Sequence, residues 1–228
     1  MVLWLDGSDK RQLLGVNFEF DFWASLSKTA ISLENVGVRP VIKDSYLRFY
    51  DHVQLLPNTF FKNESFKFYK YATILFVFDK KKVTKNTVLL DSMDKQNYIK
   101  INFDGDVYSI SQLAQPQSST NSFGSSITFS SSGAFKSKAT TDYVVFAIRL
   151  DGTLMHVYEN ETYLGSMNAK DSSFNGIVLG DSESSLYLCE LKVFNVDVDT
   201  KIKPIINGLG KKWDIDKDGV GLQDDFAF

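Results

Sequence analysis

The stretch that decides the fold is ATILFVF, residues 72–78, an apolar run rich in β-branched and aromatic side chains. A run of this length and composition is typical of a central β-strand that is buried on both faces. Two pairs of runs follow it, and each pair is joined by an Asp-Gly step. Asp-Gly supplies the positive φ angles that a type I′ turn needs, so each pair predicts an antiparallel hairpin. The paired runs are Tyr98–Phe103 with Asp106–Ile110, and Tyr143–Arg149 with Leu154–Tyr158.

The rest of the chain adds further strands and one helix. Phe174–Gly180 and Ser185–Asn195 predict a third strand pair, and shorter strands are expected at Val2–Leu5, Asn17–Phe22 and Tyr46–Tyr50. About ten strands with turn residues at short spacing indicate an all-β antiparallel sandwich or barrel. One short C-terminal helix is predicted over Lys203–Trp213, because apolar side chains recur there at helical spacing. These are Ile205, Ile206, Leu209 and Trp213.

The composition is that of a globular domain. Hydrophobic residues make up 43% and charged residues 23% of the 228 residues, which allows a sizeable core. The net charge of −3 gives no electrostatic case for nucleic acid. No apolar run approaches the roughly 20 residues of a membrane-spanning helix, and the N-terminus lacks a signal-peptide pattern, so we expect neither membrane insertion nor an export signal. The single cysteine, Cys189, excludes an intrachain disulfide and is expected to be a buried, small apolar residue.

A serine-rich tract covers Gln112–Thr140. It is too polar to add much core, so we expect a surface loop, with one short strand at Ile127–Phe129. Two interpretations remain open for this tract. It is either a mobile surface loop or a contact loop that orders on a partner.

Seven segments, taken in order, resemble a known family. They are Leu3–Asp9, Val38–Asp51, Tyr71–Phe78, Leu154–Asn160, Phe174–Asp181, Leu188–Asn195 and Ile205–Ile215. Their order and spacing are similar to those of the concanavalin A-like superfamily, in particular the laminin-G-like jelly rolls of bacterial and phage proteins. The resemblance implies an antiparallel jelly-roll β-sandwich over residues 1–213, followed by an acidic tail over residues 214–228. The superfamily includes lectins, glucanases, adhesion modules and virion proteins, so function must be argued from the site.

The sequence favours a non-enzymatic protein. Glycosidases of this superfamily need paired carboxylates on one strand, in the pattern Glu-x-Asp-x-Glu. Residues 19–24 read EFDFWA, so the second glutamate is missing. There is no glycine-rich phosphate loop and no nucleophile elbow. His52 and His156 both fall in strand-like segments and are expected to be structural. We therefore predict no catalytic residues.

The sharpest local motif lies at the C-terminus, where residues 214–219 read DIDKDG and Asp225 stands at position twelve. Ca²⁺ takes six to eight oxygen ligands, and loops of this spacing offer them at positions one, three, five, seven and twelve. The alternative is a solvated acidic tail, because these last 15 residues contain five Asp and one Lys. The predicted structural calcium ligands are Asp214, Asp216, Asp218, the Val220 carbonyl and Asp225.

Two functions fit these features. The first is a structural or adhesion module of a phage virion, such as a capsid decoration, fibre or tail adhesin, assembled in the host cytoplasm as a homo-oligomer and contacting other virion proteins, surface proteins or glycan. The alternative is an extracellular carbohydrate-binding module from a secreted multidomain protein, in which exposed tyrosines stack on sugar rings. The candidate stacking residues are Tyr46, Tyr50, Tyr69, Tyr71 and Tyr163.

Overall fold

The computed structural model describes residues 3–6, 13–16, 19–24, 31–38, 41–43, 52–83, 86–94, 97–114, 129–169 and 174–215. These residues form seventeen β-strands, two 3₁₀ turns and one α-helix. The strands are β1 Leu3–Asp6, β2 Leu13–Val16, β3 Glu19–Ala24, β4 Ser32–Asn35, β5 Val41–Lys43, β6 His52–Leu55, β7 Phe61–Phe68, β8 Tyr71–Asp79, β9 Thr87–Asp91, β10 Asn97–Phe103, β11 Val107–Ala114, β12 Phe129–Lys136, β13 Tyr143–Asp151, β14 Leu154–Glu159, β15 Thr162–Asn168, β16 Phe174–Leu179 and β17 Leu186–Phe194. The 3₁₀ turns are η2 Lys80–Lys82 and η3 Asp199–Lys201, and the helix is α1 Ile202–Lys212.

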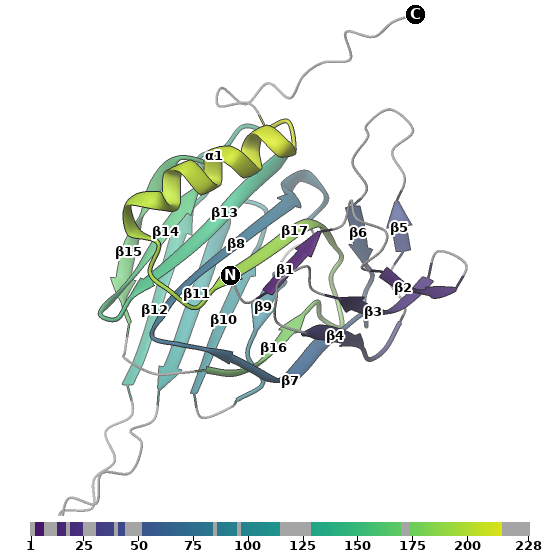
Figure 1. Cartoon of the computed structure of the whole chain (residues 1–228). Helices are drawn as coiled ribbons and strands as arrows, with labels where there is room; N and C mark the ends of the chain where they lie inside the picture. The colour runs from purple at the N-terminus through teal and green to yellow at the C-terminus, as the bar shows by residue number, and fades with distance from the viewer. Residues whose placement is uncertain are drawn as a thin grey trace, which may run out of the picture.

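The strands form two antiparallel sheets packed face to face, with α1 lying across one of them (Figure 1). The front sheet runs β15–β14–β13–β8–β17, and β1 and β6 pair with the far edge of β17. The back sheet runs β12–β11–β10–β9–β16–β7–β4–β3–β2. Strand β5 pairs with both β6 and β3 and so links the two sheets. The predicted all-β antiparallel sandwich with one short C-terminal helix is confirmed.

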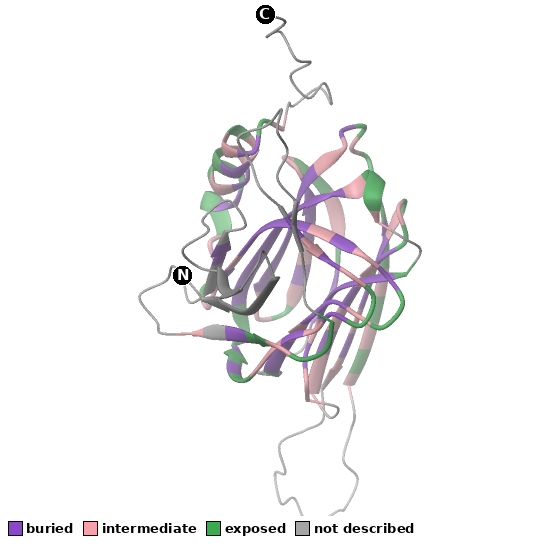
Figure 2. Cartoon of the chain, turned by 90° about the vertical axis from the view of Figure 1, so that its right-hand side faces the viewer, coloured by how far each residue is buried: buried purple, intermediate pink, exposed green. Residues whose placement is uncertain are grey.

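Strand β8 is buried on both faces, as residues 72–78 predict. Phe76 and Phe78 point between the sheets, whereas Leu75 and Val77 point outward beneath α1. This explains why the run is apolar at every position rather than at alternate ones. Between the sheets the ring of Tyr108 is stacked on Phe103 and Phe146, with centroids 4.3 and 4.1 Å apart. Figure 2 shows the buried residues concentrated along the strands and the exposed ones along the turns.

Helix α1 begins and ends within one residue of its predicted bounds. Ile202, Ile206, Leu209 and Trp213 pack on the outer face of the front sheet, where Cys189 is also buried as expected. Beyond the helix, Asp214 adopts a positive φ of 56°, and the Ile215 N–H donates to the Gly210 carbonyl at 2.7 Å. This pattern satisfies the last carbonyls of a helix. No helix within the described ranges is long and apolar enough to cross a membrane.

Two predictions about strand arrangement are wrong. Phe174–Gly180 and Ser185–Asn195 form strands β16 and β17 but do not pair with each other, because β16 pairs with β7 and β9 in the back sheet while β17 joins the front sheet. The link between them therefore crosses from sheet to sheet. Asp181 holds this link by accepting hydrogen bonds from the backbone N–H groups of Glu183 and Ser184 at 2.8 and 2.6 Å.

The serine-rich tract is also more regular than predicted. Its ends belong to β11 and to the eight-residue β12, which pair with Leu113 opposite Ser130 and Ser111 opposite Ser132. Backbone hydrogen bonding to β11 makes β12 a strand, in which Ser130 and Ser132 are exposed. Residues 115–128 of the tract, including Ile127, lie outside the described residues, as does the strand predicted at Tyr46–Tyr50.

Candidate functional site

Most of the predicted calcium loop lies outside the described residues. This holds for Asp216, Asp218, Val220 and Asp225, while Asp214 is exposed and follows the C-cap of helix α1. Among the residues that the structure does describe, no group of three or more His, Cys, Asp or Glu side chains could hold a metal ion. Calcium binding therefore stays a prediction. The backbone of Glu19 and Asp21 lies in β3, and their side chains are outside the described part.

Two glutamates of the described part of the chain, Glu159 and Glu190, are buried and engaged in hydrogen bonds. Glu159 lies at the rim between the sheets, where one carboxylate oxygen accepts from the hydroxyls of Tyr108 and Ser137 at 2.7 and 2.6 Å. Its other oxygen accepts from the N–H groups of Lys138 and Ala139 at 2.6 and 2.7 Å. Burial, together with the nearby Glu159 charge, raises the pKa of the Tyr108 hydroxyl well above its usual value. Four donors around one carboxylate indicate a structural role.

Glu190 fixes the helix to the front sheet. One carboxylate oxygen accepts from Trp213 Nε1 and from the Lys212 ammonium, both at 2.6 Å, and the other lies 2.9 Å from the Lys192 ammonium. The side chain is buried, so its charge needs these partners. Neither Glu159 nor Glu190 is therefore placed as an available general acid or base.

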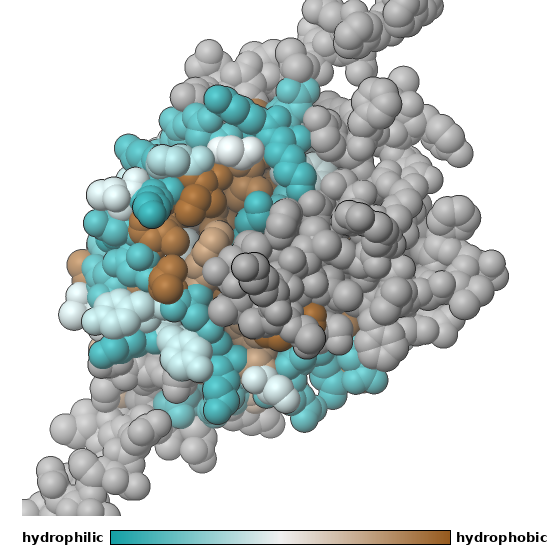
Figure 3. Space-filling model, in the orientation of Figure 1, coloured by the Kyte–Doolittle hydropathy of each residue, from teal (hydrophilic) through white to brown (hydrophobic). Residues whose placement is uncertain are grey.

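A cluster of aromatic and titratable side chains, two of them exposed tyrosines, lies on the outer face of the front sheet. We call it the tyrosine–histidine surface, and it consists of Tyr71, Asp151, His156, Tyr158 and Tyr163. The β13–β14 hairpin positions it, because the Asp151-Gly152 turn places His156 opposite Arg149. Strand β15 then brings Tyr163 opposite Tyr158, next to a register shift at Val157/Tyr158. Figure 3 shows hydrophobic residues gathered on this face of the molecule below α1, bordered by hydrophilic ones.

His156 connects the two ends of this surface. Its Nε2 lies 2.8 Å from Asp151 Oδ2, and its Nδ1 lies 3.4 Å from the Tyr163 hydroxyl. An ionised carboxylate can only accept, so the Nε2–H group donates this hydrogen bond and Asp151 accepts it. Burial raises the pKa of Asp151, but hydrogen bonds from Leu154, His156 and Thr153 outweigh it and hold that pKa well below its usual value. Asp151 therefore keeps His156 in one orientation.

The tyrosine rings differ in exposure. Tyr163 is 46% and Tyr71 44% exposed, whereas Tyr158 is only 9% exposed and supports Tyr163 from a centroid distance of 5.2 Å. Tyr71 packs on the turn at Gly152, where φ is 96° and an added Cβ would lie 3.0 Å from the tyrosine ring. The exposed rings are thus held by the fold rather than hanging free, which lowers the entropy lost when a ligand contacts them.

Arg149 secures the edge of this surface nearest to α1. Its guanidinium pairs with Asp199 and lies 3.4 Å from Asp197, and both acids belong to the segment between β17 and the helix. Thr73 donates a hydrogen bond of 3.2 Å to the Val196 carbonyl of the same segment. The segment is therefore fixed across the front sheet beside the tyrosines.

The sequence identified two of the three tyrosines of this surface, and it missed Tyr158 and the polar members. Tyr71 and Tyr163 were candidate stacking residues and are exposed, as is Tyr69, whereas Tyr46 and Tyr50 lie outside the described residues. Asp151 was interpreted only as a turn residue and His156 only as a structural one. Their spacing across an Asp-Gly hairpin was the available signal, because residues on either side of such a turn face each other.

Comparisons with known proteins show the fold. No family model matches the sequence, and no curated protein matches it either. A structure concerning the cell entry of botulinum neurotoxin type C, which depends upon interaction with two ganglioside molecules, is similar at 11% identity with a TM-score of 0.62. The binding domain of botulinum neurotoxin DC in complex with SialylT is similar at 12% identity and 0.61, and the same domain with rat synaptotagmin II at 12% and 0.60. Each match covers 91% of this chain but only 51% of the other, so the chain spans about half of these structures.

Proposed function

We propose that this protein is a non-enzymatic adhesion module that attaches to surface glycans through the tyrosine–histidine surface. The observation that carries the proposal is the exposed ring of Tyr163, which is supported by Tyr158 and flanked by the fixed His156–Asp151 pair. Sugars present an apolar ring face and a rim of hydroxyl groups. An aromatic face beside oriented polar groups complements both of these features.

The chemistry of the buried acids supports a binding role over a catalytic one. Glu159 and Glu190 are surrounded by donors, whereas glycoside hydrolysis needs two carboxyl groups that face a substrate across roughly 5–9.5 Å. Two of the similar neurotoxin structures are described as binding domains, in complex with SialylT and with synaptotagmin, and the third description names an interaction with gangliosides. These descriptions concern chains about twice as long, so they agree with a binding module without locating its site.

Two biological settings are compatible with this proposal. In the first, the module belongs to a phage virion, as a capsid decoration, fibre or tail-adhesin component, and forms a homo-oligomer. In the second, it is a carbohydrate-binding module of a secreted multidomain protein and works outside the cell. Light scattering on the purified chain separates them, because a stable oligomer favours the virion setting and a glycan-binding monomer favours the secreted one.

The proposal is tested by probing a glycan array with the full 228-residue chain and two variants. Tyr163→Ala removes the exposed ring, and Tyr98→Ala is the matched control because Tyr98 lies in β10 of the other sheet. We expect the native chain and Tyr98→Ala to bind the same glycans, and Tyr163→Ala to lose at least tenfold in affinity, about 1.4 kcal/mol. Absence of any bound glycan, or equal binding by Tyr163→Ala, would contradict the proposal.

The same array tests the predicted calcium loop when it is repeated in Ca²⁺ and in EDTA. If the loop at Asp214 to Asp225 is structural only, EDTA should lower the unfolding temperature and leave glycan affinity unchanged at low temperature. Loss of binding in EDTA would instead give the metal a part in recognition. Equal unfolding temperatures in both buffers would show that calcium does not stabilise the protein and would contradict the predicted calcium loop.

A further inference from the structure

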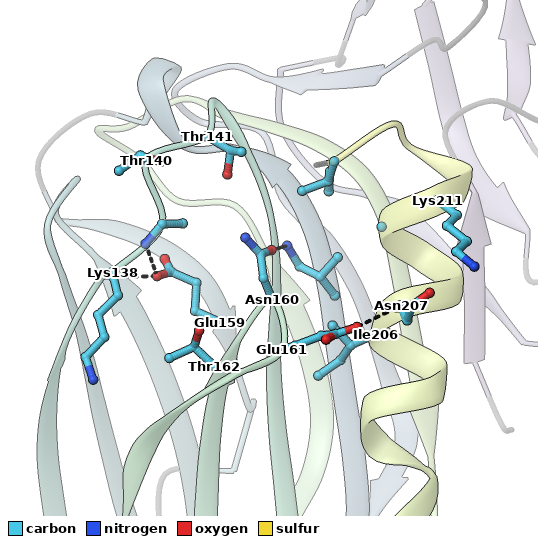
Figure 4. Close-up of a pocket in the computed structure, with 14 residues that line it drawn as sticks. Lys138, Thr140, Thr141, Glu159, Asn160, Glu161, Thr162, Ile206, Asn207 and Lys211 are labelled. Carbon is cyan, nitrogen blue, oxygen red and sulfur yellow. Dashed lines mark hydrogen bonds between the residues drawn. The ribbon is translucent and has the colours of Figure 1, made fainter. Parts of the chain in front are cut away.

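A second concave site lies at the rim of the sandwich, and it shares no residue with the tyrosine–histidine surface. It is a pocket of about 410 Å³ between the C-terminal half of α1, the β14–β15 turn and the segment that links β12 to β13 (Figure 4). This volume falls at the small end of the range for ligand pockets, roughly 300–1,000 Å³. It has room for one sugar residue rather than for a cofactor.

Thr141 supplies the observation that points to a ligand. The residue is only 5% exposed, and its hydroxyl oxygen is buried without a hydrogen-bond partner among the described residues. Thr141 lines the pocket, and Figure 4 shows its oxygen turned toward the interior. A buried hydroxyl without a partner is costly and rare in native proteins, so a group that enters the pocket should complete it.

Asn160 presents a second unused group to the same space. It occupies the β14–β15 turn with a φ of 51°, where its Oδ1 accepts from the Val145 N–H at 2.9 Å. Its own N–H donates to the Val145 carbonyl at 2.7 Å, so the residue is held from both sides. The side-chain NH₂ is left as a donor with a fixed position in the pocket wall.

The remaining lining residues define the charge of the ligand. Both carboxylates of the wall are engaged, Glu159 with its four donors and Glu161 with the side-chain amide of Asn207. The ammonium groups of Lys138 and Lys211 point away from the interior in Figure 4. An anion in the pocket would be repelled by two carboxylates and would have no cation to bind. A neutral hydroxyl group could accept a hydrogen bond from the Asn160 NH₂ and form another with the Thr141 hydroxyl.

We infer that this pocket binds one neutral, hydroxyl-bearing sugar residue, with the Thr141 hydroxyl and the Asn160 NH₂ as the groups that recognise it. Ile206, Val145 and Ile215 give the pocket apolar walls for the ring carbons. The inference does not rest on glycan binding at the tyrosine–histidine surface. The sugar can be a free monosaccharide or the end of a longer glycan, since both present the same hydroxyl groups.

Gly210 and Gly208 offer a matched pair of variants. An added Cβ at Gly210 would meet only the Ile215 carbonyl at 3.5 Å, and one at Gly208 would meet nothing within 4 Å. Gly210 lines the pocket and Gly208 does not. Both lie inside α1, where replacing glycine favours the helix. Gly210→Leu should therefore fill the pocket, and Gly208→Leu should leave it open at equal or higher stability.

The test is ligand-observed NMR on the full chain with glucose, galactose, mannose and N-acetylglucosamine, and with glucuronate as the anionic arm. We expect at least one neutral sugar to bind with a dissociation constant on the order of millimolar, and glucuronate to bind at least tenfold more weakly. Gly210→Leu should abolish binding, Gly208→Leu should retain it, and Tyr163→Ala should leave it unchanged. A disaccharide that ends in the same sugar distinguishes the two sources of the ligand. If the pocket binds glycan ends, the disaccharide should bind at least as well as the monosaccharide; if it binds only the free monosaccharide, the disaccharide should bind more weakly.

Thr141→Val separates recognition from a structural role. Removing the unpartnered hydroxyl should raise the unfolding temperature of the free protein by about 2–4 °C and lower its affinity for the sugar at least tenfold. A hydroxyl with a structural role would give a lower unfolding temperature instead. The inference is overturned if no neutral sugar binds the native chain, if Gly210→Leu binds as well as the native chain, or if Thr141→Val loses stability while keeping affinity.

Discussion

The outer faces of the two sheets differ in what they expose. On the back sheet, Ile99, Ile101 and Phe103 of β10 point inward, while Lys100 and Asn102 alternate with them on the outside. On the front sheet the outer face is partly covered by α1 and carries exposed tyrosines where the helix ends its cover. A sheet with one face in solvent alternates inward apolar and outward polar residues, as the back sheet does. This pattern does not account for the exposed tyrosines of the front sheet. This difference is why we propose that ligands contact the front sheet.

The largest difference in stability between the two faces should come from Trp213, which packs at the end of α1 on the front sheet. Trp213→Ala removes a large buried ring and leaves Glu190 without its Nε1 donor. We expect a loss of about 3–5 kcal/mol in the free energy of unfolding. Lys100→Ala on the back face should change it by less than about 0.5 kcal/mol. Urea unfolding of both variants checks this. Similar losses of unfolding free energy would mean that side chains on the two faces contribute equally to stability.

The acids of the two faces should respond differently to neutralisation. Glu190→Gln leaves Lys212 and Lys192 facing a neutral group in a buried site, and should cost about 1–3 kcal/mol of unfolding free energy. Asp91 on the back sheet lies 3.6 Å from the Lys100 ammonium, and burial raises its pKa more than Lys100 lowers it. Its ionised form is therefore disfavoured in the folded state, so Asp91→Asn should be neutral or slightly stabilising at pH 7. A clear loss for Asp91→Asn would reverse this ranking.

Acidification should act on the two faces with opposite signs. The pKa of Asp151 is lowered in the folded state, so its ionised form stabilises the protein above about pH 4, and this contribution is lost as the pH falls further. The pKa of Asp91 is raised, so protonation at falling pH removes a cost instead. Unfolding measured from pH 3 to 7 should show Asp151→Asn less stable than the native chain at pH 7, with the gap closing below about pH 4. A gap of constant size would show that the charge of Asp151 contributes nothing.

The sequence predicted local structure well and long-range pairing less well, for identifiable reasons. The run at residues 72–78, the Asp-Gly hairpins and the helix carry their information within a few neighbours, and each was placed correctly. The partners of β16 were not, because strand pairing between the two sheets depends on where a link crosses rather than on strand composition. The serines of β12 are compatible with a loop and with an edge strand alike, and only pairing with β11 decides between them.

The candidate site could be predicted only in part. Tyr71 and Tyr163 were named as candidate exposed stacking residues, but their proximity to His156 and Asp151 follows from the sheet register. The pocket beside Thr141 had no sequence signal, since helix α1 and the β12–β13 link meet there only through packing. Most of the predicted calcium ligands lie outside the described residues, so that prediction stands as it was made.

The central claim is that the exposed ring of Tyr163 is the glycan contact of this module. The most direct measurement is calorimetric titration of the strongest array glycan into the native chain, Tyr163→Phe, Tyr163→Ala and Tyr98→Ala. The account predicts that Tyr163→Phe stays within about threefold of the native affinity because the ring is kept, that Tyr163→Ala falls at least tenfold, and that Tyr98→Ala is unchanged. Native affinity in Tyr163→Ala, or a comparable loss in Tyr98→Ala, would contradict it.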